Sequence, residues 1–242
     1  MGLVYGKNPV LEAINSGTTI NKIYAQTSNK DIDQIIKEAL KRKIIVVNTD
    51  KQKLDKMIDG KNSQGIIASI TEFKYSQIRE IIEYAEYKNE KPLVVILDKI
   101  EDPHNLGAII RSCECMGVHG IIIQKRNACQ ITDTVEKVAA GACSYVKVAR
   151  VTNITESIKE LKKNGLWIYG LDMNGESEVY NTKLEGAIGI VVGNEGSGIS
   201  RLVKENCDAL MKIPMTGKIN SLNASVSAAI TIYEVVRQKN IK

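Results

Sequence analysis

Apolar residues along the N-terminal third of the chain alternate between two spacings. Val10, Leu11 and Ile14 are at helical spacing, and the same spacing recurs over 32–40 and briefly near 54–57. Short apolar runs at 23–25, 44–47 and 65–70 separate these stretches, and the run at 44–47 is entirely β-branched. An order that alternates strands and helices predicts a small sheet packed with helices.

From residue 92 the alternation becomes longer and more regular. The apolar run at 93–97 is typical of a strand that is covered on both faces. Further strands are expected at 120–123, 145–151, 167–172, 188–192 and 210–213, and helices at 105–116, 154–163, 200–206 and 224–239. Gly117 and Gly165 stand where helices stop. We predict the α/β class, with a mostly parallel sheet that binds its ligand at the carboxyl ends of the strands.

The stretch between these regions has a different composition. Residues 74–91 hold four basic and four acidic residues, with Ile and Tyr at loose helical spacing. We interpret it as a linker that can be helical. The predicted domains are therefore 1–73 and 92–242, joined by 74–91.

Composition narrows the class of protein without naming a function. The 242 residues are 43% hydrophobic and 25% charged, as in ordinary globular proteins. No apolar run suits a membrane span and no leader-like apolar segment begins the chain, so we expect a cytoplasmic protein. The five cysteines, an odd number without a Cys-x-x-Cys pair, indicate buried, reduced structural thiols rather than disulfides or a zinc site. The net charge of +5 is compatible with an anionic partner.

Two loops rich in small residues follow expected strands in the C-terminal third. The first is Gly193-Asn194-Glu195-Gly196-Ser197-Gly198, whose glycines let a ligand approach the backbone. It matches neither the dinucleotide fingerprint nor a phosphate-binding P-loop. A tight turn and a ligand loop both remain open, and Glu195 is a solvated turn residue unless a cation or ligand amine lies near.

The second loop is Ser221-Leu222-Asn223-Ala224-Ser225, directly before the longest expected helix. Helix capping accounts for one of its polar side chains and leaves others spare. A third segment, 102–111, carries Asn105 at a helix start and Arg111 about two turns on. The pattern alone favours capping for Asn105 and a solvent-facing Arg111. Three polar loops at strand ends nevertheless suit a shared ligand crevice.

Taken together, in their order and spacing, the segments 97–117, 190–200 and 213–237 resemble the SpoU (TrmH) family of RNA 2′-O-methyltransferases. The segments 5–13 (Tyr-Gly-Lys-Asn-Pro-Val-Leu-Glu-Ala) and 63–68 (Ser-Gln-Gly-Ile-Ile-Ala) are similar to the substrate-binding domain of the branch that methylates a guanosine of large-subunit ribosomal RNA. The resemblance covers nearly the whole chain.

The resemblance implies a fold that topology rules would not suggest. In this family the C-terminal part of the α/β sheet is threaded into a deep trefoil knot, of the type called SPOUT, although knots are almost absent from proteins. A small N-terminal α/β domain, L30e-like, binds the RNA. The knot holds S-adenosylmethionine, which implies cofactor contacts at Gly193, Ile213 and Leu222. The family forms homodimers through the knotted domain.

The resemblance also implies catalytic roles for Arg111, Asn105, Glu195, Ser221 and Asn223. The family's arginine has been considered the base, but arginine keeps its proton up to a pKa above about 12. We favour an Arg111 that binds an RNA phosphate or stabilises the forming alkoxide, with the other four side chains orienting Arg111 and the ribose. The expected substrate is 23S rRNA and not DNA, because only RNA carries the 2′-hydroxyl.

Three alternatives stay open. One is a transfer-RNA ribose methyltransferase, or a base methyltransferase on the related knotted fold. The second is a catalytically silent protein of the same fold that binds ribosomal RNA and confers resistance or aids assembly. The third, a nucleotide-dependent oxidoreductase, is disfavoured by the missing glycine fingerprint.

Overall fold

The computed structural model describes residues 2–16, 18, 20–70, 73–218 and 221–240. The chain divides into two compact units. The first comprises residues 1–74 together with 131–133, and the second comprises 75–130 and 134–242. Among the described residues, no helix is both long enough and apolar enough to cross a bilayer.

The first unit is a four-stranded sheet with helices packed on it. Its strands are β1 (Gly2–Tyr5), β2 (Ile20–Ala25), β3 (Val46–Asn48) and β4 (Ile66–Ile70), in the order β1-β4-β2-β3. Its helices are α1 (Lys7–Asn15), α2 (Asp33–Lys41) and α3 (Lys51–Met57), with a 3-10 turn at Lys30–Ile32. The apolar residues that gave the helical spacing, such as Val10, Ile14 and Ile35, are buried against β2 and β4. The expected small sheet with helices is therefore confirmed.

The second unit contains a seven-stranded sheet in which every recorded pairing is parallel. The strands are β5 (Leu93–Asp98), β6 (Gly120–Gln124), β7 (Lys147–Val151), β8 (Trp167–Leu171), β9 (Ser177–Glu178), β10 (Ile188–Gly193) and β11 (Ala209–Lys212). Their order is β7-β6-β5-β10-β8-β11-β9. The expected α/β class with a mostly parallel sheet is confirmed. Parallel strands place all their carboxyl ends at one edge, where the polar loops begin.

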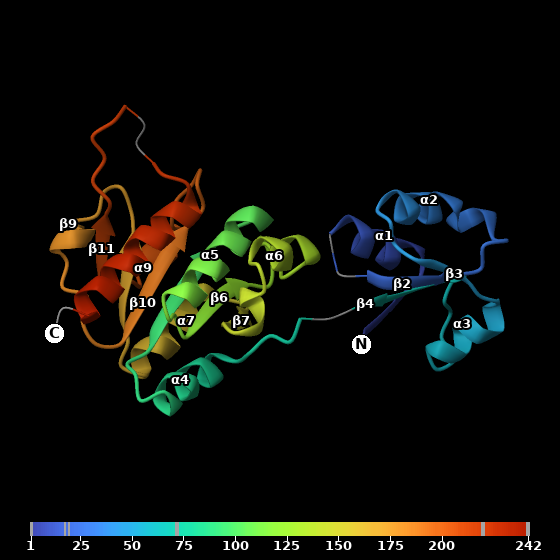
Figure 1. Ribbon diagram of the computed structural model, residues 1–242, viewed down its shortest axis with the longest axis horizontal. Helices are drawn as coiled ribbons and strands as arrows, with labels where there is room; N and C mark the ends of the chain where they lie inside the picture. Colours follow the sequence, from blue (N-terminus) through green and yellow to red (C-terminus); the bar gives the residue numbers. More distant parts are fainter. Residues whose placement is uncertain (1, 17, 19, 71–72, 219–220, 241–242) are drawn as a thin grey trace. The chain divides into compact units, whose positions relative to one another are not determined.

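Helices cover both faces of this sheet. They are α4 (Ile78–Tyr87), α5 (Pro103–Cys115), α7 (Ile154–Lys163), α8 (Arg201–Lys204) and α9 (Ala224–Asn240). The short helix α6 (Asp133–Val138) contacts Gly107 of α5, and 3-10 turns lie at Ala142–Ser144 and Val179–Asn181. The two helices α5 and α9 pack side by side, with α9 also against β10 (Figure 1). The apolar residues of α4, α7 and α8 form one core with alternate residues of the strands. Gly117 and Gly165 end their helices with φ of 69° and 82°.

The segment 74–91, which we expected to be a linker, contains α4. Ile81 of this helix is fully buried against the second sheet. The approach is close: a Cβ on Gly120 would lie 2.5 Å from the Ile81 side chain. The segment from Tyr75 on thus belongs to the second unit, and α4 forms part of its core.

The trefoil knot depends on how the chain passes from β11 to α9. Residues 219 and 220 of this passage lie outside the described part of the chain. The strand order places β11 beyond β8 while α9 returns to pack on β10 and α5. The knot itself stays a prediction.

Candidate functional site

A cavity of about 770 Å³ opens at the carboxyl edge of the seven-stranded sheet. Its walls come from the loops that follow β8, β10 and β11 and from the start of α9. Each of the three residues predicted to contact a cofactor lines it: Gly193, Ile213 and Leu222. Glu195 and Ser221 line it as well, whereas Asn105, Asn223 and Arg111 do not. The two small-residue loops therefore face one hollow, as a ligand crevice requires.

The loop after β10 folds back sharply on its own strand. Asn194 and Gly198 exchange backbone hydrogen bonds of 3.2 and 2.8 Å, and the Asn194 side chain accepts from the backbone N–H of Gly196 at 2.8 Å. A Cβ on Gly193 would lie 2.2 Å from the carbonyl carbon of Gly198 and 2.3 Å from the nitrogen of Ile199. Glycine at 193 is thus needed for this close backbone approach.

Three of the predicted catalytic side chains form one hydrogen-bonded network. Glu195 Oε1 accepts from Asn105 Nδ2 at 2.8 Å, from Asn223 Nδ2 at 2.5 Å and from the backbone N–H of Ala224 at 3.3 Å. Asn223 Nδ2 also donates to Asn105 Oδ1 at 2.9 Å. Glu195 Oε2 accepts no hydrogen bond from the described residues, so it is available to a ligand. Segments 90 and 118 residues apart along the chain converge here.

Asn223 serves this network and the helix behind it at once. Its Oδ1 accepts from the backbone N–H of Ser225 at 2.9 Å and of Val226 at 3.4 Å, which caps α9. The capping oxygen leaves Nδ2 free to donate to Glu195. Capping and site function are therefore compatible uses of one side chain.

Arg111 lies apart from the network within one chain. It is exposed, and it forms no hydrogen bond or ion pair with any part of the chain that the structure describes. It follows Asn105 by six residues of α5, which is about 240° around a helix and about 9 Å along it. Arg111 and Asn105 therefore face different directions. Ser221 is exposed at the cavity wall and forms no hydrogen bond with the described residues.

The cavity also has charged residues that the sequence pattern did not single out. Asp172, after β8, pairs with Lys204 of α8 and accepts from the backbone N–H of Asn174 at 3.0 Å. Burial raises the pKa of Asp172, but these hydrogen bonds outweigh it and hold the pKa below its ordinary value. The available signal was the position of Asp172 directly after a strand, at the edge where ligands bind.

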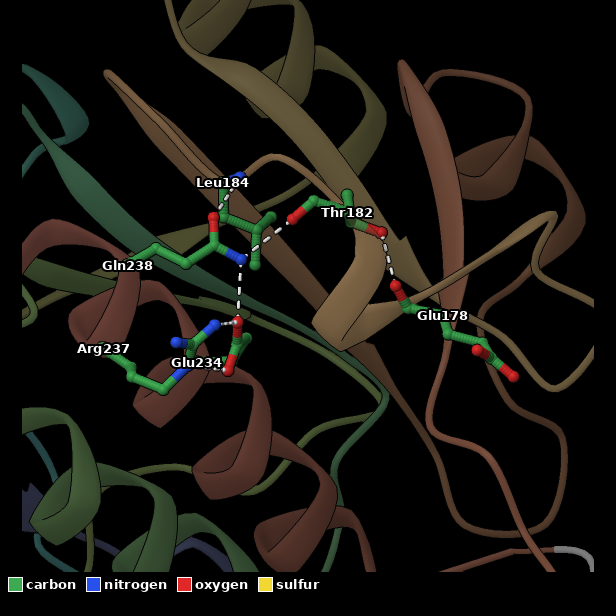
Figure 2. Close-up of polar contacts among 6 residues, drawn as sticks. All are labelled: Glu178, Thr182, Leu184, Glu234, Arg237 and Gln238. Carbon is green, nitrogen blue, oxygen red and sulfur yellow. Dashed lines mark hydrogen bonds and ion pairs between the residues drawn. The ribbon is translucent and has the colours of Figure 1, made fainter. Parts of the chain in front are cut away.

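The last turns of α9 fix the segment that carries Glu178 at the far wall of the cavity (Figure 2). Gln238 Nε2 donates to the carbonyl of Thr182 at 2.9 Å, and Gln238 Oε1 accepts from the backbone N–H of Leu184 at 2.9 Å. Gln238 Nε2 also donates to Glu234 Oε1 at 2.8 Å. Thr182 Oγ1 in turn donates to the carbonyl of Glu178 at 2.8 Å. One helix therefore shapes the cavity from both of its ends.

The five cysteines are all free thiols, and none lies at the cavity. Cys113 is buried and Cys115 is exposed on α5, so the two face different directions, as their spacing predicted. Cys115 departs from the expected burial because it lies on the outer face of the helix.

Comparison with known proteins identifies both units. Residues 92–233 match the model of the SpoU rRNA Methylase family. Residues 3–76 match the model named RNA 2′-O ribose methyltransferase substrate binding. The two matches follow each other along the chain as the resemblance predicted.

Relatives that align over nearly the whole chain are assigned to the same family. The chain is 41% identical over 239 residues to a protein of Bacillus subtilis assigned to the TrmH family of tRNA/rRNA methyltransferases, covering 98% of this chain and 96% of the relative. A Staphylococcus aureus protein assigned to the same family is 42% identical over 240 residues, again covering 98% and 96%.

Solved structures agree on the fold. The SpoU methyltransferase AviRb from Streptomyces viridochromogenes, solved in complex with AdoMet, superposes with a TM-score of 0.64 at 24% identity, covering 98% of this chain and 89% of that one. The A. aeolicus TrmH/SpoU tRNA modifying enzyme gives a TM-score of 0.58 at 30% identity, covering 67% and 84%. The chain therefore belongs to the SpoU (TrmH) family of S-adenosylmethionine-dependent RNA methyltransferases.

Proposed function

We propose that this protein transfers a methyl group from S-adenosylmethionine to the ribose 2′-hydroxyl of a guanosine in 23S rRNA. One observation carries the proposal: Glu195 lines the cavity and is also the centre of the network with Asn105 and Asn223. A cofactor in the cavity and a hydroxyl on the network would thus be neighbours. The free cysteines suit a reducing compartment, and we place the reaction in the cytoplasm.

The cavity fits the methyl donor. Its volume of about 770 Å³ lies in the range of small-molecule sites. The missing Cβ of Gly193 lets the loop 194–198 fold back on β10 and form one wall of the cavity. The carboxylates of Asp172, Glu178 and Glu195 at the cavity wall suit the cationic groups of the cofactor. When bound, S-adenosylmethionine supplies an electrophilic methyl group on a sulfonium.

The residues of the chain would then orient the acceptor. A ribose hydroxyl is a poor nucleophile, so the site must hold it in line and help remove its proton. Three donors fix Glu195 Oε1, which leaves Oε2 to accept a hydrogen bond from the 2′-hydroxyl. Asn105 and Asn223 act by holding Glu195 in place, and Ser221 at the wall can donate to the ribose.

Arg111 enters this proposal through a second copy of the chain. We propose a homodimer through the knotted domain, in which Arg111 of one protomer serves the cavity of the other. Two features support it. Arg111 is exposed and without a partner in the described residues. The neighbouring helix α9 exposes Val226, Ile230 and Tyr233 at 45, 39 and 62%, spaced as one stripe. A cation brought in this way would bind phosphate or stabilise the alkoxide.

The test is a map of 2′-O-methyl groups in 23S rRNA and transfer RNA from cells with and without the gene. The proposal expects one methylguanosine of 23S rRNA to disappear and to return on complementation. Loss of a transfer-RNA methyl group instead would make transfer RNA the substrate in place of 23S rRNA. An unchanged map would reject methylation of either RNA. Arg111→Lys tests the side chain: turnover near wild type would rule out a bidentate role for the guanidinium.

A further inference from the structure

Four exposed cations stand at the carboxyl ends of three adjacent strands of the second sheet. Lys99 follows β5, Lys125 and Arg126 follow β6, and Arg150 is the penultimate residue of β7. Among the described residues none of the four forms an ion pair. We call these four residues the cationic rim. Unpaired cations gathered at one edge of a sheet favour a polyanion.

The cationic rim begins at the cavity wall. The Asn194 side chain donates to the carbonyl of Lys99 at 3.0 Å, which joins the loop after β10 to the loop after β5. The backbone N–H of Lys99 donates to Gln124 Oε1 at 3.2 Å. The backbone N–H of Lys125 donates to the carbonyl of Val151 at 2.8 Å. Hydrogen bonds thus connect the cofactor cavity to the edge strand β7 step by step.

The loop that carries the middle cations is fixed. Gln130 Nε2 donates to the carbonyls of Gln124 at 2.8 Å and Ala128 at 3.0 Å. The backbone N–H of Cys129 donates to the carbonyl of Ile100 at 2.8 Å. Hydrogen bonds therefore hold the backbone beneath Lys125 and Arg126, so a bound ligand has to order their side chains but little of the backbone.

The outer end of the cationic rim offers a stacking surface. The Arg150 guanidinium lies 4.4 Å from the ring centroid of Tyr75. Unpaired bases stack on aromatic rings and on guanidinium planes, and this pair supplies one of each. Adjacent strands lie about 4.8 Å apart, so β7 is about 14 Å from β10. Two acidic residues, Glu101 and Asp102, lie on the loop after β5, and Asp102 accepts from the backbone N–H of His104.

We propose that the cationic rim binds the phosphates of the RNA strand beside the target nucleotide and that a flanking base stacks on Arg150. The inference rests on the proposed function, because the partner is the substrate RNA. RNA then runs from the network at Glu195 over Lys99 and Lys125 to the edge strand. The rim therefore contributes affinity for RNA without taking part in the methyl-transfer step.

The experiment removes three charges from the cationic rim and compares a matched control. The rim variant carries Lys125→Ala, Arg126→Ala and Arg150→Ala. The control variant carries Lys91→Ala, Lys163→Ala and Lys183→Ala, which are exposed and precede the opposite, amino ends of β5, β8 and β10. Binding of a 23S rRNA transcript is measured by filter retention over a range of salt concentrations, and S-adenosylmethionine binding by calorimetry.

The rim variant should lower the slope of log affinity against log salt by about 2 to 3, since each phosphate contact contributes about 0.7 to 0.9. Its KM for RNA should rise at least about tenfold, with kcat at saturating RNA and cofactor affinity within about twofold of wild type. The control should keep the wild-type slope. Equal slopes for the rim variant and wild type would overturn the inference, as would equal losses in rim and control variants.

Two further measurements separate the parts of the inference. Arg150→Lys keeps the charge and removes the plane, so affinity should fall while the salt slope stays unchanged. An unchanged affinity would refute the stacking surface. The binding readout also stands apart from the methyl map: rim-dependent RNA binding by a chain that methylates no guanosine would reject the proposed function and leave the rim in place.

Discussion

Replacing Gly193 by alanine is the sharpest perturbation of the cavity. The added Cβ would lie 2.2 Å from the carbonyl carbon of Gly198 and 2.4 Å from its oxygen. Both atoms belong to the backbone, so no side chain can rotate to make room. The loop from 194 to 198, which forms a wall of the cavity, must move away from β10.

The magnitude follows from the contacts that would be lost. Overpacking of this kind costs about 1–3 kcal/mol. Moving the loop also weakens the two backbone hydrogen bonds between Asn194 and Gly198, each with a net value of about 1 kcal/mol. We expect the free energy of unfolding to be about 2–4 kcal/mol lower than in the wild type. We expect cofactor affinity to fall at least about tenfold, because a loss of about 1.4 kcal/mol in binding free energy corresponds to a factor of ten.

The assay pairs urea unfolding with calorimetric titration of S-adenosylmethionine. Gly196→Ala is the matched control in the same loop, because a Cβ there meets only the Asn194 side-chain oxygen at 3.5 Å, an ordinary contact. The control should bind the cofactor within about twofold of wild type, a difference of about 0.4 kcal/mol. If Gly193→Ala matches this control in stability and affinity, the close backbone approach is not what shapes the site.

Three other predictions concern stability and assembly. Hydrogen bonds from Ser63 hold the pKa of Asp55 below its ordinary value, so they stabilise the fold above about pH 4 and stop doing so as the pH falls through the lower folded pKa. In urea unfolding, Ser63→Ala should therefore show a smaller loss of the free energy of unfolding at acid pH than the wild type. Burial holds the pKa of His119 low despite the attraction of Glu90, so the free energy of unfolding should decline as the pH falls below about 6.5. His119→Gln should remove that decline, and an equal slope of unfolding free energy against pH in the variant would contradict this origin. Ile230→Glu places a charge in the exposed stripe of α9 and should shift sedimentation from dimer to monomer with an unchanged circular dichroism spectrum, whereas a dimer that persists would refute the interface.

Much of the fold could be predicted because its elements are strongly patterned. The helix α7 was expected at 154–163 and is found at Ile154–Lys163, since its apolar residues repeat at helical spacing. The strand β5 was evident as a continuous apolar run with every residue buried. Strands β1 and β9 were missed because four and two residues are too few to show alternation. The strand expected to begin at 145 begins at Lys147, because a 3-10 turn occupies Ala142–Ser144.

Of the candidate site, too, only some features could be predicted from the sequence. No periodicity could bring Asn105 to Asn223, because their contact spans 118 residues; family resemblance suggested it. Periodicity did anticipate that Arg111 would face solvent. The pairing of Asp172 with Lys204 was missed, because isolated loop charges look like ordinary solvated residues until the fold places them at a cavity.

The dependence of the network on the first residues of α9 has a consequence for biosynthesis. The donors from Asn223 and Ala224 reach Glu195 only when the last helix has packed on α5 and β10. A chain emerging from the ribosome folds its earlier segments first. The network at Glu195 therefore forms only after α9 has left the exit tunnel, and under the proposed function, chains clipped before α9 should not methylate the ribosomal RNA that surrounds them during synthesis.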